Sequence, residues 1–356
     1  MPPAAAVSDL ALRLGSFRLR ALDFAVAEGE TLVILGPNGA GKSVTLETIA
    51  GFHRPQQGEI RIGGREVTFL PPERRNIALV FQNFGLFPHL TVAGNLRLAL
   101  GARRRGSGPG FDQLLSEFGI AHLASRAPAA LSPGEKQRVA LARALAAEPD
   151  LFLFDEPFSA LDARTRERLR GELASFLRKG GKSALFVTHD FADALALADR
   201  LAVMRAGSFV QEGPVRRVFA APKDRFVAEF LGIENILPAE SDGQGRVRIG
   251  QARLEVGAKE KALPPGEPVY FCLRAEDVEL SGGEGKNRLD ARVLEVRNEG
   301  VLARIALDCG FPLFSRVMSR EVERLKLFAG ARVALAIPPE KVHLLRGENG
   351  GSERGQ

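Results

Sequence analysis

The sequence predicts an α/β fold built on a parallel sheet, followed by a small all-β domain. In the first part of the chain, apolar runs of strand length alternate with segments of helical periodicity, which is typical of a parallel sheet with crossover helices. The strands are expected at 31–35, 77–81, 151–155 and 184–188, and the helices at about 42–50, 133–147, 163–178 and 190–199. After about residue 235, short segments of alternating polarity are separated by turn residues, which indicates a small β-barrel.

The chain has 356 residues, a length that suits two domains rather than one. We expect the α/β domain over 1–232, the all-β domain over 233–346 and a flexible tail over 347–356. Residues from about 92 to 130 are expected to form helices interrupted by the Gly-rich stretch 106–110, so a helical subdomain accompanies the parallel sheet.

Composition favours a globular, reduced, cytosolic chain. Hydrophobic residues make up 45% and charged residues 26%, which excludes a disordered chain, and no apolar run approaches the ~18 residues that a membrane span needs. The N-terminus lacks the pattern of a signal peptide, and Cys272 and Cys309 have no metal-binding spacing. The net charge is +6, but the basic residues are dispersed, and their one tight run at 103–105 is expected in a solvated loop. We therefore expect no nucleic acid partner, and any membrane role must come through partner subunits.

A glycine-rich segment predicts a phosphate site. It fits the P-loop pattern G-x-x-x-x-G-K-[ST], follows a predicted strand and opens a predicted helix. Its glycines let backbone N–H groups surround phosphate oxygens, and the helix N-terminus adds a favourable dipole. Lys42 is expected to reach the β- and γ-phosphates of ATP, and the Ser43 hydroxyl to ligate Mg²⁺. The segment consists of Gly36, Pro37, Asn38, Gly39, Ala40, Gly41, Lys42 and Ser43.

Two acidic residues end the predicted strand at 151–155 and its following turn. Asp155 is expected to hold Mg²⁺, directly or through water, and Glu156 to polarise the attacking water as general base. Acids at a strand end can serve solubility alone, but an Asp-Glu-Pro sequence placed after a P-loop favours the catalytic interpretation.

A third segment, Leu131-Ser132-Pro133-Gly134-Glu135, lies between the P-loop and the acidic strand. Glu135 follows Ser132 by three residues, which is the spacing of a capping box, and Pro133 would occupy the first helical position, where its missing N–H costs nothing. We expect a capped helix N-terminus that leaves the Ser132 hydroxyl and the Gly134 N–H available to a phosphate.

These motifs, in this order, resemble those of ATP-binding cassette (ABC) ATPases, in which the segment from Leu131 stands at the LSGGQ signature. The resemblance implies that Gln82 is the glutamine that senses Mg²⁺ and the attacking water, and that His189 is the switch histidine that contacts the γ-phosphate. Asp162 resembles the aspartate at the dimer seam. The resemblance also implies a head-to-tail homodimer with two ATP–Mg²⁺, in which Ser132 and Gly134 close over the ATP of the other copy.

Adenine contact is the point where the sequence departs from this family. ABC ATPases usually stack adenine on an aromatic residue upstream of the P-loop, and the corresponding place falls near Leu14. Aliphatic packing there, or the neighbouring Phe17, is expected to substitute.

The segment 271–277 resembles part of the TOBE domains that follow importer ATPases. This resemblance implies two membrane permease subunits, an extracytoplasmic substrate-binding protein and a peripheral position on the cytoplasmic face of the inner membrane. Residues 84–90, after Gln82, are expected to receive the permease, although Phe84 and Phe87 would also suit ordinary core packing.

The stretches 36–52, 70–77 and 325–333 look like those of molybdate/tungstate importer ATPases, which implies oxyanion import. Sulfate, ferric iron, sugars and polyamines remain alternatives for the solute. A soluble ABC ATPase acting on nucleic acid or ribosomes is the rival class, but such proteins usually carry tandem ATPase units, and this chain has one.

Overall fold

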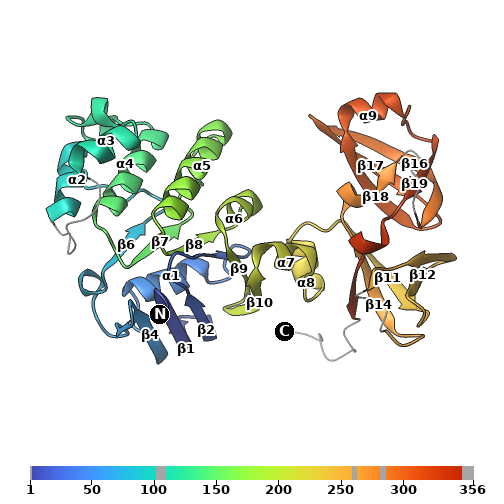
Figure 1. Ribbon diagram of the computed structural model, residues 1–356, viewed down its shortest axis with the longest axis horizontal. Helices are drawn as coiled ribbons and strands as arrows, with labels where there is room; N and C mark the ends of the chain where they lie inside the picture. The colour runs from blue at the N-terminus through green and yellow to red at the C-terminus, as the bar shows by residue number, and fades with distance from the viewer. Residues whose placement is uncertain (1, 102–109, 259–262, 281–285, 347–356) are drawn as a thin grey trace. The chain divides into compact units, whose positions relative to one another are not determined.

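The computed structural model describes residues 2–101, 110–258, 263–280 and 286–346, and its contacts divide the chain into two units (Figure 1). The first unit runs from Met1 to Val218, and the second begins at Phe219. The loop expected at 103–105 and the tail expected at 347–356 lie outside the described residues.

A six-stranded, mostly parallel sheet forms the centre of the first unit, and the strands expected from the sequence are confirmed. Strand β3 pairs in parallel with β8 and β9, and β7 pairs in parallel with β6 and β8. The strands, in spatial order, are β10 (Ser208–Pro214), β9 (Arg200–Arg205), β3 (Thr31–Leu35), β8 (Ala184–Thr188), β7 (Leu151–Asp155) and β6 (Ile77–Val80). All five residues of β3 and of β8 are buried, as expected for strands covered on both faces.

A second, antiparallel sheet in this unit was not expected from the sequence. Its order is β2-β1-β4-β5, with bounds β1 (Ala5–Leu14), β2 (Phe17–Val26), β4 (Gln57–Ile62) and β5 (Arg65–Glu66). Asp9 and Ala21 have φ of 50° and 41°, and the pairing register shifts around them. These irregularities break the period-2 alternation by which a strand is recognised, which explains why the pattern was missed.

Helix α1 (Lys42–Ala50) packs between these two sheets, and its Leu46 and Ile49 share one core with residues of β1, β3 and β8. Helices α5 (Ala163–Lys179) and α6 (Phe191–Leu197) cover the other face of the parallel sheet (Figure 1). The expected helical subdomain consists of α2 (Val92–Gly101), α3 (Phe111–Glu117) and α4 (Pro133–Ala146), and α4 contacts both others.

The second unit contains the expected small all-β domain. Its two five-stranded sheets have the orders β13-β12-β11-β14-β20 and β15-β19-β16-β17-β18. One apolar core lies between them and includes Phe271, Val293 and Leu335. The strand bounds are β11 (Asn235–Ser241), β12 (Arg246–Ile249), β13 (Ala252–Glu255), β14 (Pro268–Leu273), β15 (Glu279–Leu280), β16 (Arg288–Glu299), β17 (Leu302–Asp308), β18 (Pro312–Met318), β19 (Arg332–Ala336) and β20 (His343–Arg346). Helix α9 (Ser319–Arg324) follows β18.

The contacts divide the chain earlier than the change of sequence pattern near Ile233. Helix α7 (Val215–Ala220) spans the division, and α8 (Arg225–Phe230) packs on the β strands, because Ala228 and Ile233 share an apolar cluster with Cys272. Arg274 also donates to the carbonyl oxygens of Leu231 and Phe219 at 3.3 and 3.0 Å. The second unit therefore begins with the end of α7 and with α8, before the β strands.

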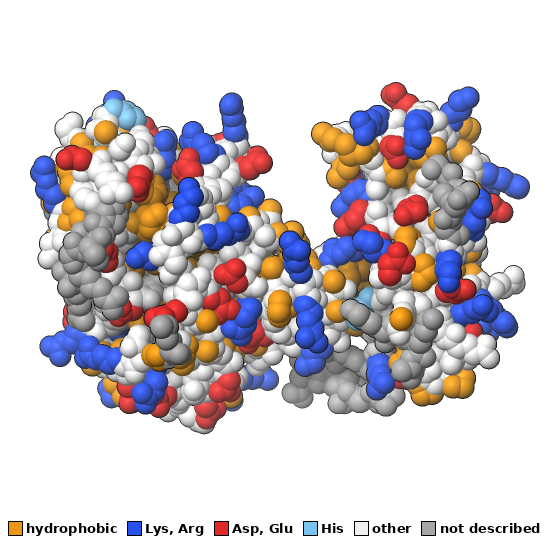
Figure 2. Space-filling model, in the orientation of Figure 1, with side chains coloured by type: hydrophobic (Ala, Val, Ile, Leu, Met, Phe, Trp, Pro, Cys, Tyr) orange, Lys and Arg blue, Asp and Glu red, His pale blue; other side chains and the backbone are white. Residues whose placement is uncertain are grey.

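Basic and acidic side chains are interspersed on the visible face of each unit (Figure 2), in keeping with the dispersed basic residues of the sequence. In the described parts of the chain, no helix combines the length and the apolar character needed to cross a bilayer.

Candidate functional site

The turn between β3 and α1 forms the phosphate loop expected from the sequence. Gly41 immediately precedes α1 with φ of 108°, a conformation that favours glycine, and a Cβ on it would lie 2.4 Å from Phe17 Cζ. Lys42 is only 6% exposed, and its Nζ donates to the carbonyl oxygens of Gly36 and Pro37 at 2.8 and 3.1 Å. The ammonium is thus folded back over the loop, where it can meet a phosphate.

A cavity of about 620 Å³ opens over this loop, a size that suits a small-molecule ligand. It brings together the P-loop with Gln82, Glu156 and His189, which come from three other parts of the sequence. Phe17 lines it too, whereas Leu14 does not belong to the lining, so of the two residues considered for adenine the structure places Phe17 at the site. The lining residues are Phe17, Asn38, Gly39, Gly41, Lys42, Ser43, Val44, Gln82, Glu156, Ser159 and His189.

Asp155 is not among the lining residues, but it contacts Ser43, which does line the cavity. The Ser43 hydroxyl donates to Asp155 Oδ1 at 2.9 Å, which joins the end of β7 to the start of α1. Burial raises the pKa of Asp155, although the Ser43 hydrogen bond and the Lys42 charge act in the opposite direction. A hydroxyl and a carboxylate in contact, with the amide of Gln82 in the same cavity, are the hard oxygen donors that Mg²⁺ prefers.

The ammonium of Lys42 interacts with the charges of two carboxylates, Glu156 and Asp155. Burial lowers the pKa of Lys42, while the charges of Glu156 and Asp155 raise it. The Lys42 ammonium is desolvated and lies near two carboxylates. It can form a charge-assisted hydrogen bond with a polyphosphate that enters the loop.

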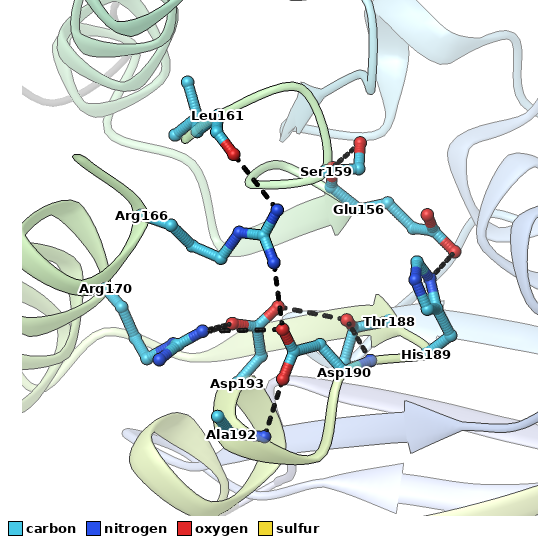
Figure 3. Close-up of polar contacts among 10 residues, drawn as sticks. All are labelled: Glu156, Ser159, Leu161, Arg166, Arg170, Thr188, His189, Asp190, Ala192 and Asp193. Atoms are coloured by element: carbon cyan, nitrogen blue, oxygen red, sulfur yellow. Dashed lines mark hydrogen bonds and ion pairs between the residues drawn. The ribbon is translucent and has the colours of Figure 1, made fainter. Parts of the chain in front are cut away.

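Glu156 and His189 both line the cavity and point toward one another (Figure 3), with His189 Nδ1 3.0 Å from Glu156 Oε1. Glu156 has φ of 43°, a sparsely populated conformation for a residue with a side chain, and such strain is concentrated at functional sites. Its carbonyl accepts hydrogen bonds from both the backbone N–H and the hydroxyl of Ser159. The backbone that aims this carboxylate is therefore held on a short turn.

The segment at Ser132 forms the capped helix start that its spacing predicted. Ser132 precedes α4, its Oγ accepts from the Glu135 N–H at 3.3 Å, and Glu135 Oε2 accepts from the Ser132 N–H at 2.8 Å. Hydrogen bonds from Ser132 hold the pKa of Glu135 below its usual range. The carboxylate thus turns back onto its own helix start.

The described residues that line the cavity do not include Ser132, Gly134 or Asp162. Ser132 and Asp162 are exposed, and Asp162 precedes α5, where its Oδ1 accepts from the Thr165 N–H at 3.0 Å. The structure therefore separates the expected site residues into those around the cavity and those at the starts of two helices.

Five polar residues beside this site were not predicted from the sequence to contribute to it (Figure 3). Four of them lie within the expected helices 163–178 and 190–199. Each takes part in hydrogen bonds or ion pairs around the turn that carries His189. An arginine pair spaced by four residues in the helix after Asp162 was the available signal. The residues are Arg166, Arg170, Thr188, Asp190 and Asp193.

Two domain families match the chain: the ABC transporter family over residues 19–159 and the TOBE domain over 271–345. The molybdate/tungstate import ATP-binding protein of Pyrococcus horikoshii is 38% identical over 92% of this chain and 96% of its own length. The corresponding protein of Thermococcus kodakarensis is 45% identical over 78% of this chain and 90% of its own length. A sulfate/thiosulfate import ATP-binding protein of Chromobacterium violaceum is 38% identical over 96% and 95% of the two chains.

Among solved structures, a dimeric ATP-binding cassette in a post-hydrolysis state, bound to ADP and Pi, matches with a TM-score of 0.53 and 31% identity. The match covers 60% of this chain and 99% of that one. The family models, the full-length relatives and this structure agree on the fold and on the nucleotide. The chain belongs to the ATP-binding proteins of ABC importers that carry a TOBE domain, and it couples ATP hydrolysis to transport.

Proposed function

We propose that this chain is the Mg²⁺-dependent ATPase subunit of an oxyanion importer, with molybdate or tungstate as the first candidates for the solute. The observation that carries the catalytic part is one cavity lined by the Glu156–His189 pair and by Ser43, whose hydroxyl donates to Asp155. The solute rests on the relatives from Pyrococcus horikoshii and Thermococcus kodakarensis, whose names specify molybdate/tungstate import.

In this proposal, the backbone of the phosphate loop surrounds the ATP phosphates, and Lys42 neutralises the β- and γ-phosphates. The loop residues are Gly36, Pro37, Asn38, Gly39, Ala40 and Gly41. Ser43, Gln82 and Asp155 would hold Mg²⁺, which supplies charge neutralisation at the phosphates when bound. The contact between Ser43 and Asp155 supports this assignment, because the two side chains already share one hydrogen bond.

Glu156 is the proposed general base, which takes a proton from the attacking water, and Gln82 orients that water. His189 keeps Glu156 aimed and donates to the γ-phosphate oxygens. The 3.0 Å contact between His189 and Glu156 supports a paired action, and the side chain of His189 is 54% exposed, so it can turn toward a nucleotide.

A homodimer is proposed because Ser132, Gly134 and Asp162 do not line the cavity of their own chain. In a head-to-tail dimer, the Ser132 hydroxyl and the Gly134 N–H would close over the ATP of the second copy, and Asp162 would lie at the seam. In this chain the Ser132 hydroxyl donates to Glu135 Oε2 at 2.8 Å, so on dimer closure the hydroxyl would exchange this carboxylate for a phosphate oxygen of the second copy's ATP.

Two membrane permease subunits would hold the dimer on the cytoplasmic face of the inner membrane, and an extracytoplasmic binding protein would deliver the solute. The proposed contact surface is the segment 84–90, in which Phe87 is 40% exposed. Arg143 shapes this segment, because it donates to the Gly85 carbonyl at 2.6 Å and lies over the Phe87 ring at 5.3 Å.

Reconstitution with a permease and a binding protein that co-purify with this chain tests the proposal. Liposome-embedded transporter should hydrolyse ATP faster when the binding protein is loaded with molybdate or tungstate. The relative from Chromobacterium violaceum makes sulfate the second candidate, so sulfate-loaded binding protein is the matched comparison. Stimulation by sulfate alone would overturn the molybdate assignment, and absence of any ATP hydrolysis would overturn the catalytic one.

A further inference from the structure

The turn that carries His189 is fixed on both sides by hydrogen bonds that do not involve its imidazole (Figure 3). The Thr188 hydroxyl is buried, accepts from the Asp190 N–H at 3.0 Å and donates to Asp193 Oδ2 at 3.0 Å. Asp190 Oδ1 accepts from the Ala192 N–H at 2.7 Å and so caps α6. The neighbours of His189 are therefore anchored, and their position decides where the imidazole stands against Glu156.

Helix α5 supplies two arginines to this anchor, one helical turn apart. Arg170 Nε donates to Asp193 Oδ1 at 2.7 Å, in a pair that is largely buried. Arg166 reaches two different loops: its Nη1 donates to Asp190 Oδ2 at 3.3 Å, and its Nη2 donates to the Leu161 carbonyl at 3.0 Å. Arg166 is thus the side chain that joins the turn at His189 to the segment before Asp162.

The same end of α5 touches the parts of the chain that would face a second copy. Asp162 caps α5, and Leu161 directly precedes Asp162 in the sequence. A Cβ on Gly134 would lie 3.0 Å from Thr165 Cγ2, so the start of α4 packs directly on the first turn of α5. A displacement of either segment by another subunit would move the atoms to which Arg166 is bound.

We propose that Arg166 is a positioning residue of the ATPase. It ties the segment ending at Leu161 to the turn bearing His189, so that engagement of the second subunit fixes the imidazole in the position that it already holds against Glu156. The inference rests on the homodimer of the proposed function. Arginine suits the task because its planar guanidinium presents donors in fixed, divergent directions, whereas a lysine ammonium is a single mobile point.

The test compares Arg166→Met, which keeps the length of the stem and removes both hydrogen bonds, with Arg168→Met. Arg168 lies on the same helix, its side chain is 56% exposed, and it pairs only loosely with Glu172 at 3.9 Å. We expect Arg166→Met to lower kcat by about 10- to 100-fold, as a small misplacement of a reacting group does. The Kd for ATP, measured by calorimetry, should stay at the wild-type value, because the P-loop contacts are intact. The Hill coefficient for ATP should fall toward one, and Arg166→Lys should recover part of the rate.

Equal kcat and Hill coefficient in Arg166→Met and Arg168→Met would overturn the inference. If circular dichroism shows that Arg166→Met does not fold, Asp190→Asn carries the test, since asparagine caps a helix equally well. It removes the charge that faces Arg166 at 3.3 Å and, at 3.6 Å, Arg170, which keeps its buried pair with Asp193. Asp190→Asn should then reproduce the loss of kcat at unchanged Kd, and a wild-type rate would overturn the inference. Where both fold, the double variant should lose no more than one single variant, and additive losses count against the link. A wild-type protein without ATPase activity would instead refute the proposed function.

Discussion

Replacing Arg75 should destabilise the first unit more than any surface change nearby. Arg75 is 3% exposed, and its guanidinium donates to four backbone carbonyls: Leu70 at 2.8 Å, Thr68 at 2.9 Å, Thr48 at 3.0 Å and Ile49 at 2.8 Å. The last two are carbonyls at the end of α1, which have no partner within the helix. Arg75 therefore caps the helix whose opposite end holds the phosphate loop.

The magnitude follows from those carbonyls. In Arg75→Leu, the Thr48 carbonyl keeps the Gly51 N–H at 3.1 Å, but the carbonyls of Ile49, Thr68 and Leu70 lose their guanidinium donor. A charge-assisted hydrogen bond is worth more than a neutral one, and a buried acceptor left unpaired costs about 1–3 kcal/mol. The leucine recovers part of this through apolar contact. We expect the free energy of unfolding to fall by about 3–5 kcal/mol.

Urea unfolding followed by far-ultraviolet circular dichroism is the suitable assay. The chain has no Trp, and its single Tyr270 lies in the second unit, so fluorescence would not report on Arg75. The transition of the first unit is identified by its shift to higher urea with ATP, because a ligand stabilises the unit that binds it. Arg74→Leu, an exposed neighbour, is the control and should stay within about 0.5 kcal/mol of wild type. A loss below about 1 kcal/mol in Arg75→Leu would show that the buried guanidinium does not stabilise this helix end in the way its contacts indicate.

Four further predictions concern individual side chains. Glu156→Gln should bind ATP as wild type does and lower phosphate release by about 100-fold or more, because the general base is lost; a rate near wild type would contradict that role. Ser132→Ala should cost about 1 kcal/mol of stability in thermal or urea unfolding, whereas Glu135→Gln should keep the cap, and equal losses would contradict the capping box. Because the pKa of Glu135 is lowered on folding, the cap contributes fully above the usual glutamate pKa of about 4.3, and that contribution is lost as pH falls through the lower folded value; hydrogen exchange at the Ser132 amide should show it. Burial raises the pKa of Cys309 to about 12, so this thiol should stay neutral and react slowly with a thiol reagent at pH 8, and fast reaction of the folded protein would contradict its burial.

Four of the six strands of the mostly parallel sheet, β3, β6, β7 and β8, were predictable from local apolar runs, whereas β9 and β10 were not expected. Four consecutive apolar residues in β3 end at a glycine turn, and four in β7 end at two acidic residues. The capping box at Ser132 was predictable for the same reason, since all of its hydrogen bonds lie within four residues. Interactions of this kind can be predicted from the sequence because they do not depend on residues far away in the chain.

The missed features depend on partners far apart in the sequence. Arg75 binds carbonyls more than twenty residues away, at Thr48 and Ile49, and Arg166 binds Asp190 across two elements of the fold. Both arginines look like ordinary charged surface positions in the sequence, where charge and helical spacing carry no sign of burial. Gly51 is partly predictable. Its φ of 96° is typical of a glycine at the end of a helix, but only the structure shows that a Cβ there would lie 2.6 Å from Arg75 Nε.

The expected site residues occupy two kinds of position, and this explains why one chain does not gather them all. Lys42, Gln82, Glu156 and His189 follow the carboxyl ends of β3, β6, β7 and β8, which lie in adjacent order in one sheet, so they converge on one cavity. Ser132 and Asp162 instead cap α4 and α5, and both are exposed. Strand ends within a sheet converge through the fold itself, but exposed helix starts need a ligand or a second chain to approach them. The link through Arg166 lies where these two sets meet, and it is therefore the place where assembly of two subunits can act on the chemistry of one.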